Sequence, residues 1–258
     1  MKTSEGLLAI DVGNTSIAFG VFGPGLKTFR IETAALKSKD FPRRFLKALG
    51  SSQKTIEGAA IASVVPWADS LLTRVCLRYL KIRPYFIDHC SPIPIKNLYR
   101  HPKEVGADRI VNAVAAWEMF HRPMVVVDFG TAATFDCITA KGEYAGGLIA
   151  PGPDMASESL HLKTAKLPFV RIEKPARIIG KTPVESIQSG LYYGYVSLVD
   201  GILQKLLKEL GPGARAIATG GLASLIAGSS RYLKKGSVYP HLTLEGIKKI
   251  YKNGVFRF

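Results

Sequence analysis

The sequence predicts an α/β fold built from two similar halves, and three observations support this prediction. A buried-strand run, an acidic D-x-G turn and a second strand occur near the start of the chain and again near its middle. The two copies superpose with a constant offset of 117 residues, which carries Asp11 onto Asp128. Segments of strand and helix character alternate around both copies, as in α/β proteins. Because each D-x-G hairpin contributes an antiparallel pair, we expect mixed sheets flanked by helices.

The first half opens on a strand at residues 7–10, where a continuous apolar run is typical of a buried strand. The D-x-G turn follows, and residues 17–22 form the second strand of the hairpin. Apolar spacing then predicts three helices and one strand, in the order helix 40–49, strand 58–65, helix 68–80 and helix 105–120.

The second half repeats the hairpin with strands at 124–127 and 134–138. A long amphipathic helix is predicted at 185–210, followed by a strand at 214–218 and a glycine pair that opens a further helix. Pro123 interrupts the chain between a helix and the second hairpin. We therefore place the domain boundary near residue 120, which gives one domain at 1–120 and another at 121–258.

The chain of 258 residues carries a net charge of +15 at neutral pH. The charge is spread evenly, with 17 Lys and Arg against 10 Asp and Glu in residues 1–118, and 18 against 10 in residues 119–258. The densest basic stretch is 161–181. A clustered basic face would favour nucleic acid, whereas an even spread favours a solvated surface and attraction to anionic ligands such as ATP. We do not expect a nucleic-acid partner.

The sequence also bears on the cellular compartment. The N-terminal apolar run is short and is followed at once by Asp11, so we expect no signal peptide. No window of eighteen uncharged apolar residues exists, so we expect no membrane span. The three cysteines, Cys76, Cys90 and Cys137, are far apart, which fits a reducing compartment. These features predict a cytoplasmic protein.

The first D-x-G turn has the composition of a phosphate-binding turn. Gly13 allows the backbone to approach a ligand closely, and the N–H groups of residues 13–15 are candidate donors to phosphate oxygens, together with the Asn14 and Thr15 side chains. Asp11 adds a carboxylate that can hold Mg²⁺ through water. The turn at Asp128 offers the same groups in the second half. Two such turns at equivalent points of a duplicated unit predict a nucleotide-binding phosphotransferase.

A third constellation begins the helix at 105–120. Asp108 lies in the first turn, where the helix dipole favours the charged carboxylate, so we expect it to stay ionised. Arg109 is unusual at a positive helix end and is better explained if it faces an anionic ligand. Since successive helical residues point about 100° apart, one acceptor molecule could meet Asp108 at its hydroxyl and Arg109 at its acid.

Two common nucleotide motifs are missing. No G-x-x-x-x-G-K-[ST] loop occurs, which argues against a P-loop kinase, and no G-x-G-x-x-G follows the first strand, which argues against a dinucleotide enzyme. Gly220 and Gly221 follow a strand and begin a helix, where they could contact a flat adenine ring or a phosphate.

Six motifs together resemble type III pantothenate kinases. They occur in the family's order and span nearly the whole chain: residues 11–15, 106–109, 128–131, 146–152, 164–168 and 220–221. The resemblance implies the actin-like ATPase fold of the acetate-and-sugar-kinase superfamily, with two ribonuclease-H-like halves. It implies ATP with Mg²⁺, pantothenate as the acceptor, K⁺ or ammonium as an activating cation, and a homodimer. The reaction would be the first step of coenzyme A biosynthesis and would give 4′-phosphopantothenate.

The resemblance also implies roles for individual residues. Asp108 would accept the proton of the acceptor hydroxyl, Asp128 would ligate the monovalent cation, and Thr131 would contact phosphate. The remaining ATP-binding residues would be Asp11, Val12, Gly13, Asn14, Thr15, Ser16, Ile17 and Ala18. The remaining pantothenate-binding residues would be Tyr99, Gly106, Ala107, Arg109 and, from the partner subunit, Thr182.

This chain departs from the family pattern at a few positions. Pro183 stands where the family has the cross-subunit threonine, and Thr182 precedes it; His101 and Ala133 replace a common asparagine and a usual threonine. Two other readings remain: another small-acid or sugar kinase of the same fold, and a non-catalytic regulatory or nucleic-acid-binding protein on this scaffold. The four charged residues Asp11, Asp108, Arg109 and Asp128 together favour catalysis.

Overall fold

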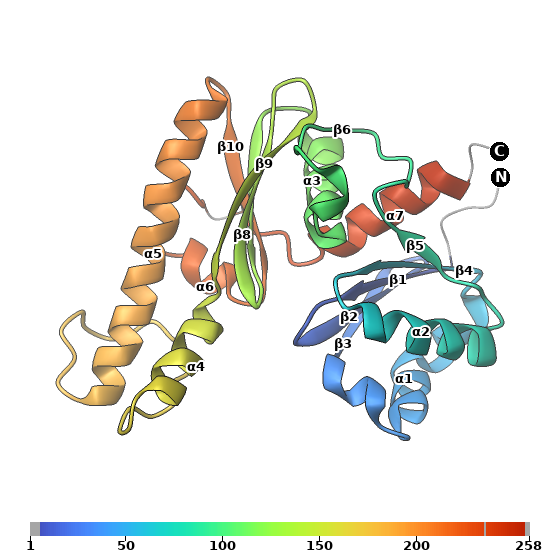
Figure 1. Ribbon diagram of the computed structural model, residues 1–258, viewed down its shortest axis with the longest axis horizontal. Coiled ribbons are helices and arrows are strands. Elements are labelled where there is room, and N and C mark those ends of the chain that lie inside the picture. The colour runs from blue at the N-terminus through green and yellow to red at the C-terminus, as the bar shows by residue number, and fades with distance from the viewer. Residues whose placement is uncertain (1–5, 235, 256–258) are drawn as a thin grey trace. The chain divides into compact units, whose positions relative to one another are not determined.

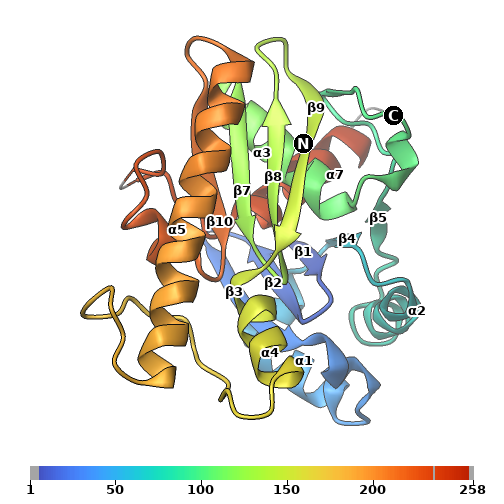
Figure 2. The ribbon, with the colours of Figure 1, turned by 60° about the vertical axis from the view of Figure 1, so that its left-hand side comes forward.

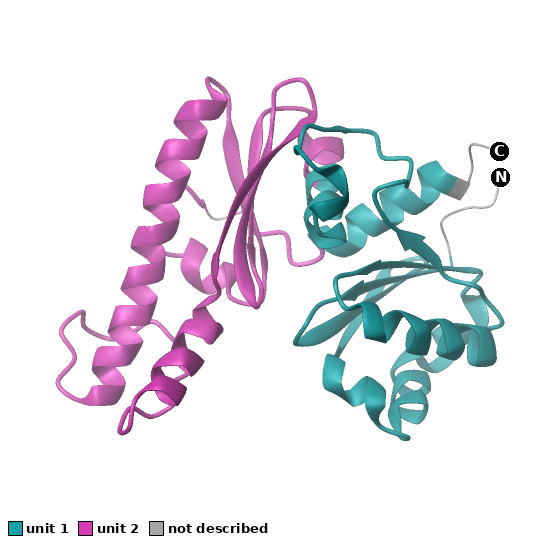
Figure 3. Ribbon diagram, viewed as in Figure 1, with its two compact units in different colours: residues 1–115, 242–258 teal, residues 116–241 magenta. Residues whose placement is uncertain are grey.

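The computed structural model describes residues 6–234 and 236–255. The chain divides into two compact units (Figure 3). One comprises the residues up to Ala115 together with the C-terminal helix, and the other comprises Ala116–His241. The predicted halves, 1–120 and 121–258, follow the sequence duplication. The compact units differ from them because the C-terminal helix packs with the first unit.

The first unit contains a five-stranded sheet in the order β3-β2-β1-β4-β5 (Figure 1). Its strands are β1 (Leu7–Val12), β2 (Ser16–Phe22), β3 (Leu26–Glu32), β4 (Gly58–Ser63) and β5 (Tyr85–Ile87). Its helices are α1 (Phe41–Leu49), α2 (Pro66–Val75), the first part of α3 (Ala107–Phe120) and α7 (Leu242–Val255). Its short elements are η1 (Thr33–Lys37), η2 (Gly50–Thr55), the π-helical turn η3 (Cys76–Leu80), β6 (Lys96–Asn97) and η4 (Pro102–Glu104).

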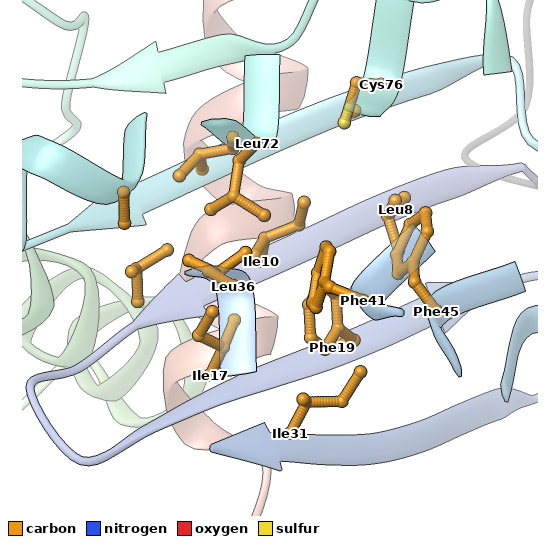
Figure 4. Packing of buried hydrophobic residues seen from close by; sticks show 14 of the residues in the cluster. Leu8, Ile10, Ile17, Phe19, Ile31, Leu36, Phe41, Phe45, Leu72 and Cys76 are labelled. Atoms are coloured by element: carbon orange, nitrogen blue, oxygen red, sulfur yellow. The ribbon is translucent and has the colours of Figure 1, made fainter. Parts of the chain in front are cut away.

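Buried aromatic side chains hold the first unit together on the face covered by α1. Phe19 stacks on Phe29 with ring centroids 4.7 Å apart, and Phe41 lies 5.9 Å from Phe45. Figure 4 shows these α1 rings facing the strands beside Leu8. Burying a Phe or Leu side chain contributes about 1.5–3 kcal/mol. This cluster therefore fixes the strands that carry the first D-x-G turn.

The second unit contains four neighbouring strands in the order β10-β7-β8-β9. They are β7 (Met124–Phe129), β8 (Ala132–Ile138), β9 (Glu143–Pro151) and β10 (Arg215–Gly220). Its helices are α4 (Pro153–Lys163), α5 (Pro183–Leu210) and α6 (Ala223–Ala227), with the end of α3. In Figure 2, α5 runs along this sheet, and its buried residues, among them Leu191, Val199 and Leu203, join the core of the unit.

The two units repeat one topology. In the first, β1 pairs antiparallel with β2 and parallel with β4; in the second, β7 pairs antiparallel with β8 and parallel with β10. The strands β3 and β9 occupy the matching third position, next to β2 and β8. The predicted duplication and mixed sheets are therefore confirmed at the level of strand order.

The sequence predictions of individual elements differ from the structure in two ways. The helix predicted at 68–80 is α2 followed by the π-helical turn η3, and it begins at Pro66 because proline is well tolerated at a first helical position. The strands β3, β5 and β9 and the helices α4 and α7 were not predicted. Across the described ranges, none of the helices combines the length and apolar character that crossing a bilayer requires.

Candidate active site

The first D-x-G turn joins β1 to β2 in a tight hairpin. Val12 is opposite Ile17 in the register, and the Gly13 N–H donates to the Ser16 carbonyl at 3.1 Å. That N–H, one of the predicted phosphate donors, closes the hairpin in this structure. Asn14 and Thr15 are exposed at the tip, so their side chains and backbone are accessible to a ligand.

The side chains on both sides of the tip have a different role. Val12, Ile17 and Ala18 are buried in the core, and Ser16 is half-buried. Within the predicted ATP segment, these buried residues can offer a ligand only backbone groups. The polar side chains of the segment are those of Asp11 and Ser16, which are half-buried, and those of Asn14 and Thr15 at the tip.

Thr33, which the sequence analysis missed, anchors the turn from inside the fold. Its side chain is buried, its hydroxyl donates to the Gly13 carbonyl at 2.6 Å, and its N–H donates to the Thr15 carbonyl at 3.0 Å. These bonds engage two carbonyl oxygens of the turn, which would otherwise repel an anion. Only the pairing of β2 with β3 brings Thr33 to this place, so no local sequence signal could have revealed it.

The second D-x-G turn lies between β7 and β8 in the second unit. Asp128 is half-buried and opposite Thr134, and Thr131 is exposed at the tip. The Gly152 N–H donates to the Thr131 carbonyl at 3.0 Å. A Cβ at Gly152 would collide with the Gly130 and Thr131 carbonyls, so only glycine allows this close approach.

The glycine pair at the end of β10 packs against the same turn. The Gly221 N–H donates to the Phe129 carbonyl at 3.1 Å. Gly220 has φ +92°, and a Cβ there would lie 2.6 Å from Oδ1 of Asp128. The structure thus brings three separate sequence motifs, around Asp128, Gly152 and Gly220, to one place in the second unit. Glycine at 220 lets the end of β10 pass close to the Asp128 carboxylate and the Phe129 carbonyl.

Asp108 lies in the first turn of α3. Its Oδ1 accepts the N–H of Arg109 at 2.8 Å. Burial raises the pKa of Asp108, while the Arg109 N–H and the Arg109 charge lower it, and the net shift is upward. Desolvation of the carboxylate therefore outweighs the contributions of Arg109, which a position in the first helical turn alone does not indicate.

Arg109 is buried, and its charge acts on Asp108. The two side chains therefore interact electrostatically. The sequence alone predicted only that each contacts a different end of the acceptor. Gly106 lies directly beside them. A Cβ at Gly106 would lie 2.5 Å from Oδ1 of Asp108, so a larger residue there would displace this carboxylate.

The C-terminal helix α7 holds the start of α3 in position. The Thr243 hydroxyl donates to Oδ1 of buried Asn112 at 2.8 Å. Gly246 packs against Val111 so closely that a Cβ would collide with the Val111 carbonyl oxygen. Helix α7 was absent from the sequence prediction, and it supports the helix that carries Asp108.

A pocket of about 370 Å³ adjoins this segment within the first unit. Gly106, Ala107 and Ile110 line it, together with residues from the ends of β4 and β5 and from η4. Of the predicted acceptor residues, Gly106 and Ala107 line the pocket. Tyr99 is not among its lining residues, but its N–H donates to Oδ1 of Asn97, which is one of them, at 2.9 Å.

Comparisons with known proteins fit this arrangement. A family profile described as type III pantothenate kinase matches residues 7–205. A type III pantothenate kinase from Anaeromyxobacter sp. is 44% identical over 252 residues, covering 95% of this chain and 98% of the relative. Another from Desulforapulum autotrophicum is 46% identical over 261 residues, covering 97% and 98%. The chain belongs to the type III pantothenate kinase family.

Solved structures show the fold of this kinase. A protein from Sinorhizobium meliloti, described as a 2-dehydro-3-deoxygalactonokinase, aligns with a TM-score of 0.60 at 13% identity, covering 98% of this chain and 97% of its own. The actin-like ATPase fold, with its duplicated ribonuclease-H-like halves, is thereby confirmed.

In this kinase Thr182 is the N-cap of α5. Its hydroxyl oxygen accepts the Glu185 N–H at 3.2 Å, and the Glu185 carboxylate accepts the Lys181 N–H at 2.7 Å. Such caps contribute about 1 kcal/mol. The capping bond uses an acceptor lone pair of Thr182 and leaves its hydroxyl hydrogen, so the residue can cap the helix and still donate to a ligand.

Proposed function

We propose that this kinase transfers the γ-phosphoryl group of ATP to the primary hydroxyl of pantothenate, giving 4′-phosphopantothenate and ADP at the first step of coenzyme A biosynthesis. One observation carries the proposal: Asp108 combines a raised pKa with a fixed place beside Gly106, on a segment that lines a pocket of about 370 Å³. That size suits a small acceptor molecule.

The acceptor site in this proposal consists of Tyr99, Gly106, Ala107 and Arg109 with Asp108 as the base. The buried guanidinium of Arg109 supplies the charge that matches the carboxylate of pantothenate. Its effect on Asp108 implies that binding of this anion alters the proton affinity of the base. Thr182 from a partner subunit would donate its hydroxyl hydrogen to the acceptor.

The phosphates of ATP are proposed to bind the exposed tip of the first turn, with residues 11–18 as the binding segment and Thr131 as a further donor. Asn14 and Thr15 provide side-chain donors. The hydrogen bonds from Thr33 occupy the carbonyl oxygens of Gly13 and Thr15. The half-buried carboxylate of Asp11 can hold the Mg²⁺ of the nucleotide through water. No lysine of the P-loop kind is needed for this arrangement.

We propose Asp128 as the ligand of a K⁺ or ammonium ion. The residues fit such an ion in their chemistry, because oxygen atoms gather here: the position of a Cβ on Gly220 lies 2.6 Å from Oδ1 of Asp128 and 2.5 Å from the Phe129 carbonyl oxygen. Oxygen ligands are what hard cations prefer. When bound, the ion supplies positive charge against the phosphates.

Catalysis then depends mainly on position and charge, because the transition state of phosphoryl transfer is loose. The acceptor oxygen forms a bond to the γ-phosphorus, the bond from that phosphorus to the β–γ bridging oxygen breaks, and ADP leaves with the electron pair. Asp108 takes the hydroxyl proton. A raised pKa makes a carboxylate a stronger base, and base assistance of this kind contributes about 10²–10⁴-fold.

A homodimer and a cytoplasmic location complete the proposal. Gly190, Gly194 and Gly201 lie on an exposed face of α5, and a Cβ at any of them would meet no atom of the described chain within 4 Å. Mid-helix glycine costs about 1 kcal/mol against alanine. The glycines are therefore better explained by close approach of a second copy than by packing within the chain. An ATP-dependent reaction and the free thiol of Cys90 fit the cytoplasm.

The test is ADP release from ATP with Mg²⁺ and K⁺, with and without pantothenate. We expect release to depend on pantothenate, with 4′-phosphopantothenate as product, and to fall sharply when Na⁺ replaces K⁺. A panel of sugars and small hydroxy acids serves as the control for acceptor identity. Turnover of another acceptor but not of pantothenate would overturn the substrate, and full activity without K⁺ or ammonium would overturn the role of Asp128.

A further inference from the structure

The turn after β5 places three side chains with different metal-binding atoms side by side. Asp88, His89 and Cys90 are consecutive and exposed, and a carboxylate oxygen, an imidazole nitrogen and a thiol sulfur lie within 4.8 Å of one another. The mechanism above uses none of these residues. A modest rotation of exposed side chains brings atoms at this separation to a common ion, because ligand bonds to zinc are about 2.0–2.3 Å long.

The backbone of this turn is fixed by its own hydrogen bonds. The Ser91 N–H donates to the Asp88 carbonyl at 3.1 Å, and the Asp88 N–H donates to Oγ of Ser91 at 3.0 Å. Ser91 is buried, and the Tyr85 hydroxyl donates to its Oγ at 3.0 Å. The Cys90 N–H donates to Oδ1 of Asp88 at 2.8 Å. None of these bonds uses the imidazole of His89 or the sulfur of Cys90, and the second oxygen of the carboxylate is available for another contact.

We propose that Asp88, His89 and Cys90 form a binding site for Zn²⁺ or a similar divalent transition-metal ion. The donor set decides the metal class. Mg²⁺, Ca²⁺ and K⁺ prefer oxygen ligands, whereas a nitrogen and a thiolate together select zinc and its neighbours. Three protein ligands leave a position for water, as in open zinc sites. The site is distinct from the Mg²⁺ and K⁺ positions proposed above.

The site also borders the pocket in the first unit. Asp88 and His89 line that pocket, together with Lys103 and Glu104 and the acceptor residues Gly106 and Ala107. A bound ion fixes the two side chains in the pocket wall and narrows the space next to the acceptor segment. Resting on the proposed function, we infer that the ion raises KM for pantothenate and changes kcat little, because Asp108 is not one of its ligands.

Binding is tested on the full chain after treatment with a chelator, with Co²⁺ as the spectroscopic probe. We expect a thiolate-to-cobalt charge-transfer band in the near ultraviolet, lost when Zn²⁺ is added. Cys90→Ser should abolish the band, and Asp88→Asn and His89→Ala should each weaken binding at least about tenfold. His241→Ala removes an exposed histidine outside the cluster and should bind Co²⁺ as the wild type does.

A second readout uses the thiols. All three cysteines lie within the described residues, and Cys90 alone among them is exposed. Zn²⁺ should therefore protect the single accessible thiol from alkylation. A cobalt spectrum without a thiolate band, or equal affinity in His89→Ala and the wild type, would overturn the site. Thermal unfolding verifies that each variant is folded.

The kinetic consequence is measured separately. Zn²⁺ should raise KM for pantothenate in the wild type but not in Cys90→Ser, which controls for exchange of Zn²⁺ with Mg²⁺ on ATP. An unchanged KM in protein that binds Co²⁺ would refute the effect of the ion on pantothenate binding, but it would not contradict the metal site. Absence of pantothenate turnover would instead contradict the proposed function, without bearing on the cobalt spectrum.

Discussion

At the scale of single residues, Asp108 shows how burial and charge set the properties of one carboxylate. Its first-turn position, the Arg109 N–H and the Arg109 charge all favour the ionised form, yet burial raises its pKa overall. A general base needs both an available lone pair and appreciable proton affinity. The raised pKa of Asp108 supplies the proton affinity, and the positive charge of Arg109 remains beside it.

Asp108→Asn tests the role of this carboxylate as a base. Asparagine is nearly isosteric, and its oxygen can still accept the Arg109 N–H, so we expect a folded protein with normal ATP binding. Turnover should fall at least about a hundredfold. Steady-state kinetics and nucleotide titration measure the two properties. Near-normal turnover in a well-folded variant would mean that Asp108 is only a structural residue of the helix.

The same variant makes a prediction about stability and pH. Because the folded-state pKa of Asp108 is raised, the native protein holds this proton more tightly than the unfolded chain does. Above the folded-state pKa, the ionised carboxylate of Asp108 therefore lowers the free energy of unfolding. Asparagine carries no charge, so Asp108→Asn should have a higher Tm than the wild type at neutral pH. The difference should shrink as the pH falls through the raised pKa and vanish below about pH 3.9, where both states are protonated.

Thermal unfolding across a pH series measures this difference, using Asp40→Asn as the control. Asp40 is partly exposed and pairs with Arg43 on the surface, so no comparable gain at neutral pH is expected there. A lower Tm for Asp108→Asn than for the wild type at neutral pH would show that the hydrogen bond and the Arg109 charge outweigh burial.

At the scale of secondary-structure elements, helix α7 contributes to the site without carrying a catalytic residue. It packs on the sheet of the first unit, with Leu244 against Gly20 of β2 and Tyr251 against Gly58 of β4, and Gly246 meets Val111 of α3. The contact between Thr243 and Asn112 adds a buried hydrogen bond. A helix more than 120 residues away in sequence thus sets the position of Asp108.

Gly246→Ala tests this packing. In open space a mid-helix change from glycine to alanine stabilises a protein by about 1 kcal/mol. Here the added Cβ would collide with the Val111 carbonyl, so we expect the opposite sign and a loss of more than about 1 kcal/mol. Urea unfolding measures the free energy of unfolding. We also expect kcat to fall, because a shift of α3 moves Asp108. A gain in stability would show that α7 does not press on α3.

At the scale of the whole molecule, exposed apolar side chains concentrate in the second unit. They occur in β9, α4, the 164–182 segment and α5, and include Ile149, Leu162, Phe169, Ile178 and Ile179. A concentration of exposed apolar side chains commonly marks an interface. Together with the open glycines of α5, it supports the proposed homodimer.

Gly194→Trp tests that assembly. The side chain would project into open space in a single chain, so the monomer should fold normally. If a second copy packs against this face of α5, the indole blocks it, and light scattering should show a monomer where the wild type is a dimer. Gly194→Ala is the matched control, with a small side chain at the same place. A dimeric tryptophan variant would place the interface elsewhere.

The sequence by itself determined the duplicated hairpins, the α/β class and the family, because these depend on local apolar runs, turn residues and motif order. It also led to the proposed roles of Asp108 and Asp128. Only the tertiary structure showed that Thr33 occupies the carbonyls of the first turn, that Gly152 and Gly220 converge on the second, and that α7 belongs to the first unit. It also showed that burial raises the pKa of Asp108. The physical reason is common to all of these: hydrogen-bond partners, close backbone approach and desolvation arise from contacts between residues distant in the chain, which no local pattern encodes.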